Sequence, residues 1–114
     1  MRALGPEYLN RYPSDESADA ALLMVAEADR EDSRPASALG SYNRMLKLFP
    51  RTKLLDRTLY GMGEAYLMMH DCGNAKLAYQ SCETRFAKEK IGQEAKAKLA
   101  TIAKAPPGLC APPE

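Results

Sequence analysis

The sequence of 114 residues lacks several features that would indicate a particular class of function. Its formal net charge is only +1, so it has no long-range field that would gather phosphates or anionic lipid. No apolar stretch approaches the roughly 20 residues that a transmembrane helix needs. The first residues, MRALGPEYLN, contain no apolar run like that of a secretory signal. We therefore expect neither nucleic-acid binding nor membrane insertion, and we expect either a cytosolic chain or a mature or excised part of a longer protein.

Residues for catalysis or metal binding are also scarce. The one histidine, His70, stands in a predicted turn with no nucleophile at a relay spacing, and a surface position is the simpler interpretation. The cysteines at positions 72, 82 and 110 form no C-x-x-C pair and have no metal-like spacing with histidine. The segment Gly61-Met62-Gly63 has no preceding strand and no third glycine, so it does not match a phosphate-binding loop. The sequence predicts no catalytic residue, no metal and no cofactor.

The pairing of the cysteines stays open. Cys72 and Cys82 are on or beside one predicted helix, and ten residues at 1.5 Å per residue place them about 15 Å apart, beyond disulfide reach. An intramolecular bridge would have to join Cys72 or Cys82 to Cys110 near the C-terminus. The sequence does not decide between such a bridge and free thiols.

What the sequence does contain is an internal repeat with a period of 37 residues. The stretch KLFPRTKLLDRTLYGMGEAY at 47–66 repeats features of NRYPSDESADAALLMVAEAD at 10–29, and a truncated third copy begins at Phe86. The identical pairs are Pro13 and Pro50, Asp19 and Asp56, Leu22 and Leu59, Glu27 and Glu64, Ala28 and Ala65, Ala38 and Ala75, Tyr42 and Tyr79, and Phe49 and Phe86. The chain is thus two full units with fragments at both ends.

Each unit is predicted to form a helix, a tight turn and a second helix. In the second unit, apolar residues recur at helical spacing on both sides of HDCGN at 70–74, a segment typical of a turn. Small residues at Gly63, Ala75 and Cys82 would let two helix backbones approach closely, and Tyr66 and Tyr79 would fill the volume between helices. We expect helices at about 6–12, 16–31, 35–49, 53–69, 73–87 and 91–104.

At these positions the sequence resembles the tetratricopeptide repeat family. Leu59, Met62-Gly63, Tyr66, Ala75, Tyr79 and Cys82 occupy the signature positions of the second unit, and Leu22, Val25-Ala26, Ala38, Tyr42, Met45 and Pro50 those of the first. Asp29 departs from the aromatic and Ala87 from the closing proline. The resemblance covers about residues 10–103, and its 37-residue spacing is similar to that of bacterial envelope members, the periplasmic protein of the Tol-Pal system and the assembly lipoprotein of the outer-membrane β-barrel machinery.

The resemblance implies an all-α fold, a right-handed superhelix of helical hairpins with a C-terminal capping helix. We divide the chain accordingly into a remnant of a preceding repeat helix (1–14), unit 1 (15–50), unit 2 (51–87), a capping helix (88–105) and a disordered tail (106–114), which is rich in proline and short of apolar surface. The compartment that it implies is the periplasm or cell envelope, with the cytoplasm as the alternative.

In such stacks the first helices of the hairpins line a concave face. The residues that point outward between the packing positions are the predicted partner-binding residues: Leu23, Glu27, Arg30, Arg57, Tyr60, Glu64, Leu67 and Met68. The function expected is non-catalytic binding of a partner peptide or protein. Two alternatives remain: Leu67 and Met68 pack in the core, or the chain is a structural module that stacks on a copy of itself as a homodimer.

Overall fold

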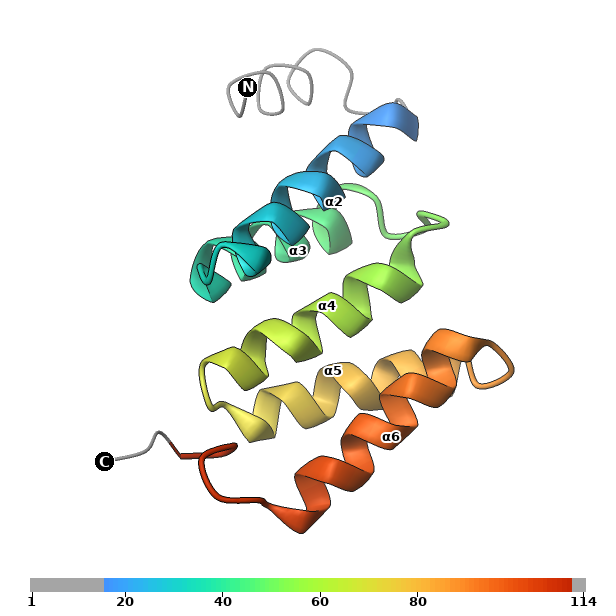
Figure 1. Ribbon diagram of the computed structural model, residues 1–114. Helices are drawn as coiled ribbons and strands as arrows, with labels where there is room; N and C mark the ends of the chain where they lie inside the picture. Colours follow the sequence, from blue (N-terminus) through green and yellow to red (C-terminus); the bar gives the residue numbers. More distant parts are fainter. Residues whose placement is uncertain (1–15, 112–114) are drawn as a thin grey trace.

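The computed structural model describes residues 16–111, and this part of the chain is entirely helical (Figure 1). Its helices are α2 (Glu16–Glu31), α3 (Pro35–Leu48), α4 (Leu55–Met68), α5 (Cys72–Arg85) and α6 (Lys90–Lys104). Each lies within two residues of the bounds expected from the sequence, so the all-α prediction is confirmed for this part. The short helix expected at 6–12 lies outside the described residues.

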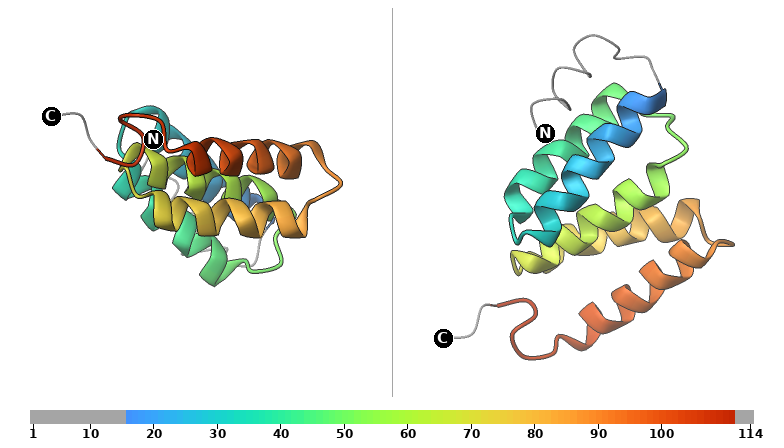
Figure 2. Two further views of the ribbon diagram at one scale, coloured as in Figure 1. Left: turned by 90° about the horizontal axis from the view of Figure 1, so that it is seen from below. Right: turned by 45° about the horizontal axis from the view of Figure 1, so that its top comes forward.

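The helices form two layers. Consecutive helices pack against each other as hairpins, and α4 also contacts α2 and α6. As a result α2, α4 and α6 lie side by side in one layer, with α3 and α5 behind them (Figures 1 and 2). The molecule measures 45 × 36 × 18 Å along its principal axes, and its smallest dimension is that of two helix layers. It is a slab with two broad faces.

The turns of the two hairpins are copies of each other. Ser33 and His70, one period apart, both adopt a left-handed backbone with φ of 61°. The N–H groups of Ser33 and His70 each bond to the carbonyl three residues earlier, at 3.1 and 2.9 Å respectively. The N–H groups of the next residues, Arg34 and Asp71, each bond to the carbonyl five residues earlier, at 2.8 and 2.9 Å. This hydrogen-bond pair ends a helix with a left-handed residue and a sharp change of direction. The repeat found in the sequence is therefore a repeat of structure.

The second helices begin with local signals that the sequence contains. Pro35 is the first residue of α3, where its missing N–H leaves no bond unmade. Asp71 caps α5, because its carboxylate accepts a hydrogen bond from the N–H of Asn74 at 3.2 Å and another from the Asn74 side chain at 2.8 Å. Both bonds lower the pKa of Asp71, and the bond from the Asn74 side chain has the larger effect.

Two buried tyrosines fill the space between the layers. Tyr42 of α3 and Tyr79 of α5 have no exposed surface, and each lies against a glycine of α4. A Cβ atom built on Gly63 would stand 2.6 Å from the Tyr79 ring, and one on Gly61 would overlap the Tyr42 hydroxyl. Gly63 is thus a point of close approach, as predicted, and Gly61 is a second one. Tyr66, by contrast, is only partly buried.

The C-terminal segment differs from its prediction. We call residues 105–111 the C-terminal strap. Cys110 forms a disulfide with Cys72 at the start of α5, and the backbone oxygen of Leu109 lies 3.1 Å from Nδ1 of His70. Leu109 also packs against the core. The expectation of a disordered tail is therefore wrong for 106–111, because the sequence left open the disulfide that anchors this segment to α5; residues 112–114 lie outside the described part.

Candidate protein-binding groove

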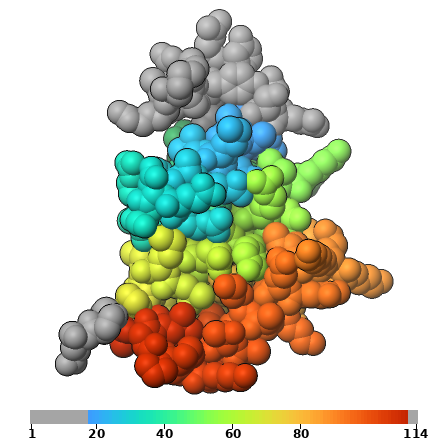
Figure 3. All heavy atoms as spheres, viewed as in Figure 1, coloured from blue at the N-terminus to red at the C-terminus, as the bar shows by residue number. Residues whose placement is uncertain are grey.

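The layer of α2, α4 and α6 carries a shallow hollow on its outer face, which is the face toward the viewer in Figure 3. Its volume is about 430 Å³. Side chains from all three helices line it: Arg30, Glu31, Glu64, Leu67, Met68 and Lys98. We call this hollow, together with Glu27, Arg57 and Tyr60 beside it, the groove.

Seven of the eight residues predicted for partner binding are at least partly exposed, on α2 or α4. They are Glu27, Arg30, Arg57, Tyr60, Glu64, Leu67 and Met68. Arg57 and Glu27 form an ion pair. The hollow is lined by Arg30, Glu64, Leu67 and Met68. Burial raises the pKa of Tyr60, and Glu64 lies close enough for its carboxylate to raise that pKa further, so the seven residues form one surface.

Leu23 does not belong to that surface. Its side chain is 1% exposed and lies in the core. The repeat aligns it with Tyr60, and both were predicted to point outward between the packing positions. However, α2 packs against both α3 and α4, so its apolar stripe is wide enough to include the neighbours Leu22 and Leu23 together. A short leucine is covered there, whereas the longer Tyr60 is only half-buried.

Two ion pairs cross the groove from helix to helix. Arg57 of α4 holds Glu27 of α2, with Nη2 and Oε1 2.7 Å apart. Lys98 of α6 lies with its Nζ 3.4 Å from Oε1 of Glu64 on α4. Because all four side chains keep contact with water, these pairs stabilise the fold little. Their effect is to present charges of both signs at fixed positions.

Glu64 connects the groove to the layer behind it. Its carboxylate accepts a short hydrogen bond from the hydroxyl of Tyr79, which reaches forward from α5. Tyr60 meets the same ring edge-on, with centroids 5.4 Å apart. Burial, with the nearby charges of Glu64 and Glu94, raises the pKa of Tyr60, and burial with the Glu64 bond raises that of Tyr79. Both phenols are therefore neutral at physiological pH.

The apolar part of the groove is formed by Leu67 and Met68. Met68 is 40% exposed, so it is available for contact. Leu67 is partly buried and also packs against the core. The sequence left open whether these two residues belong to the surface or to the core. Met68 lies on the surface, and Leu67 contributes to both.

Lys98 and Glu31 line the hollow but are not among the residues predicted from the sequence. Lys98 was assigned to a capping helix, so its outer side was not considered as part of the same face. The repeat contains a signal for Glu31, since one period maps it onto Met68, but it maps Lys98 onto the buried Gly61 and gives no signal there.

Beneath the charged side chains lies a buried hydroxyl without a partner. The Tyr42 oxygen is buried and makes no hydrogen bond among the described residues. Burial raises the pKa of Tyr42 to about 12, and the next causes are the charges of Arg30 and Glu27, which act in opposite directions. These groove charges therefore lie close to the phenol, although the hydroxyl itself is covered.

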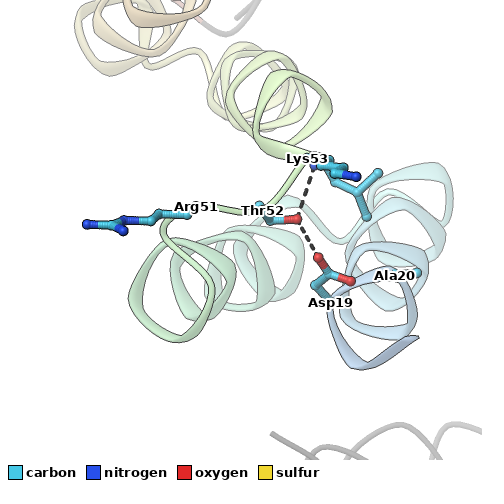
Figure 4. A pocket seen from close by; sticks show the side chains of 6 residues that line it. Asp19, Ala20, Arg51, Thr52 and Lys53 are labelled. Carbon is cyan, nitrogen blue, oxygen red and sulfur yellow. Dashed lines mark hydrogen bonds between the residues drawn. The ribbon is translucent and has the colours of Figure 1, made fainter. Parts of the chain in front are cut away.

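A second hollow, of about 340 Å³, lies where the loop between α3 and α4 meets α2 (Figure 4). Here the Thr52 hydroxyl donates a short hydrogen bond to Asp19 and accepts one from the N–H of Leu54 at 3.1 Å. Arg51 points away from Asp19 in Figure 4. The Asp19 side chain is thus used to fasten the loop to α2, so this hollow is part of the structural framework.

Reactive side chains elsewhere have structural partners. Cys82 is completely buried, and burial raises the pKa of its thiol to about 11. His70 is engaged with the Leu109 carbonyl, which can only accept, so Nδ1 carries the proton there. Within residues 16–111 no group of three or more His, Cys, Asp or Glu side chains is placed to hold a metal ion. No helix in this range combines the length and apolar character of a membrane span.

Comparison of the chain with protein-family models, with curated proteins and with solved structures finds no match. A function is therefore inferred from the repeat and from the geometry of the groove.

Proposed function

We propose that this chain is a non-catalytic scaffold of the tetratricopeptide type, which binds a partner peptide or protein along the groove. The hairpins would continue the right-handed superhelix of that family. Support for the proposal comes from the repeated turns, from the tyrosine–glycine contacts between layers, and from a layer of first helices that carries the groove.

The observation that carries the proposal is the composition of the groove. The apolar side chains of Leu67 and Met68 line the same hollow as two cations, Arg30 of α2 and Lys98 of α6. The carboxylates of Glu31 and Glu64 line it too. Such a hollow can cover one apolar side chain of a partner, while charges of both signs select its register. A peptide with an apolar residue flanked by charged residues fits this pattern better than a uniformly acidic or basic chain.

We place the protein in the bacterial cell envelope. The spacing of the repeat suggested this compartment, and the Cys72–Cys110 bond supports it, since structural disulfides persist in oxidising compartments such as the periplasm.

The test compares two double variants of matched chemistry. Arg30→Glu with Met68→Ala alters the groove, and Lys76→Glu with Leu77→Ala makes the same kinds of change on the exposed side of α5. Partners are captured from a bacterial envelope extract with the unaltered chain and titrated against all three proteins. We expect the groove variant to bind at least tenfold more weakly, about 1.4 kcal/mol, and the α5 variant to bind normally.

Circular dichroism and melting curves should be the same for all three proteins, because none of the four side chains is in the core. Equal binding by the groove variant and the parent, or a larger loss in the α5 variant, would exclude the groove as the binding site.

A further inference from the structure

The C-terminal strap is held to the rest of the molecule at few points. Its anchors are the Cys72–Cys110 disulfide, the hydrogen bond from His70 to Leu109, and the half-buried Leu109 side chain. Within the strap, one backbone hydrogen bond is formed, from the Leu109 N–H to the Pro106 carbonyl at 3.1 Å, and it closes a single turn. The strap therefore depends on the disulfide for its position.

The strap closes the open end of a hairpin. Helices α5 and α6 meet at the turn of residues 86–89 and diverge toward their other ends, as Figures 1 and 2 both show. At that open end the strap runs from the last residue of α6 back to the first residue of α5. It closes a covalent ring through α5 and α6, whose two cysteines have a sequence separation of 38.

The two halves of α6 are held differently. The first half is anchored by Gly92, whose Cβ position is occupied by the backbone of Phe86, and by the fully buried Ala95. In the second half, Ile102 is buried and Leu99 only partly so, and the helix ends at Ala105 in a left-handed conformation. Loss of the strap would therefore release the second half first.

The disulfide is accessible to attack. Cys110 is exposed and Cys72 is partly exposed, in contrast to the buried thiol of Cys82. A thiolate of a dithiol reductant can attack one sulfur, form a mixed disulfide and release the other cysteine as a thiol. The second thiol of the reductant then displaces the remaining cysteine. The net change is two electrons and two protons to the protein, and the reductant leaves as a disulfide.

We propose that the Cys72–Cys110 bond is a redox-sensitive lock on α6. Reduction by a dithiol releases the strap and the second half of α6 from α5, while α2, α3 and α4 stay folded. Because Lys98 on α6 forms one wall of the groove, opening the lock also removes that wall. This consequence for binding rests on the proposed function, whereas the opening itself does not.

The experiment measures amide hydrogen exchange of the full chain before and after treatment with dithiothreitol. We expect exchange to become at least tenfold faster in residues 98–111 and to change less than twofold in α2 to α4. Cys110→Ser, without reductant, should give the same pattern, and the parent chain without reductant gives the reference rates.

Iodoacetamide labelling of the reduced chain distinguishes local from global opening. Labelling of Cys72 and Cys110 alone is expected, with Cys82 protected. Unchanged exchange in residues 98–111 overturns the proposal. Faster exchange in every helix, with labelling of Cys82, also overturns it, because the bond would then hold the whole fold. If the lock opens locally but captured partners bind both redox states equally, the lock stands and the groove proposal fails.

Discussion

Single residues set the distance between the two helix layers. Tyr79 and Tyr42 are large and fully buried, and they fit only because α4 presents glycine opposite each ring. Both glycines lie inside a helix, where glycine costs about 1 kcal/mol relative to alanine. Close packing against an aromatic ring offsets that cost. The same residue type at Gly40 of α3 meets no atom within 4 Å of its Cβ position, so it makes no such contact.

Alanine substitution at the two kinds of glycine should have opposite effects. At Gly63 the new methyl group would stand 2.6 Å from the fully buried Tyr79 ring, which would have to shift. We expect Gly63→Ala to lower the free energy of unfolding by about 1–3 kcal/mol. Gly40→Ala should raise it by up to about 1 kcal/mol, because the exposed helix gains a better helix former. Urea denaturation of both variants measures the difference. Equal effects of the two changes would contradict the close approach at Gly63.

The two tyrosine hydroxyls also differ in their contribution to the free energy of unfolding. The Tyr79 hydroxyl donates to Glu64, whereas the Tyr42 hydroxyl is buried without a partner among the described residues. We expect Tyr79→Phe to destabilise by about 1–2 kcal/mol, since it removes a hydrogen bond to a charged group. Tyr42→Phe should be neutral or stabilising by about 1 kcal/mol, since it removes an unsatisfied polar atom. Thermal melts at neutral pH compare them, and a large loss in Tyr42→Phe would reveal a partner for its hydroxyl.

At the scale of elements, the turns are the most regular part of the molecule. Each first helix ends in a left-handed residue that is not glycine: Ser33 after α2 and His70 after α4. A left-handed backbone strains any residue with a Cβ atom by about 1–2 kcal/mol. Ser33 is exposed, and its side chain has no hydrogen-bond partner among the described residues that would offset the strain. His70 has one, the Leu109 carbonyl of the strap.

Glycine at these two positions should therefore act differently. Ser33→Gly removes the strain of the left-handed backbone and breaks no side-chain hydrogen bond among the described residues. We therefore expect a gain of roughly 0.5–1 kcal/mol in the free energy of unfolding. His70→Gly brings the same relief but removes the bond to Leu109, and its gain should be smaller or reversed. Chemical denaturation of the oxidised proteins measures both. A larger gain at position 70 than at position 33 would show that the histidine bond contributes nothing.

The elements were predictable from the sequence because their signals are local and occur twice. The turn at 70–74, the helical spacing of apolar residues and the 37-residue repeat were enough to place every described helix. What could not be predicted depends on distant parts of the chain. Leu23 is buried because α4 covers α2, and the strap is ordered because Cys110 finds Cys72 rather than Cys82. Neither fact has a pattern in the neighbouring residues.

At the scale of the whole molecule, residues 16–111 form a slab with two broad faces, and a second copy of the chain would have to pack on one of them. Large exposed apolar side chains are spread over several helices: Met24, Leu48, Met68, Met69 and Leu77. Only Met68 and Met69 are neighbours in sequence. A stable interface commonly buries about 800 Å² on each partner and has an apolar centre. The described residues present isolated apolar positions with charged residues between them.

We therefore expect the full chain to stay monomeric in sedimentation velocity runs from micromolar to submillimolar concentration. The groove then remains free for a different protein, as the proposed function requires. A sedimentation coefficient that rises with concentration would favour the self-associating structural module instead. In that case Leu77→Ser and Met68→Ser identify the face involved: loss of association in Leu77→Ser alone assigns it to α5 and leaves the groove open, whereas loss in Met68→Ser alone means that a second copy occupies the groove.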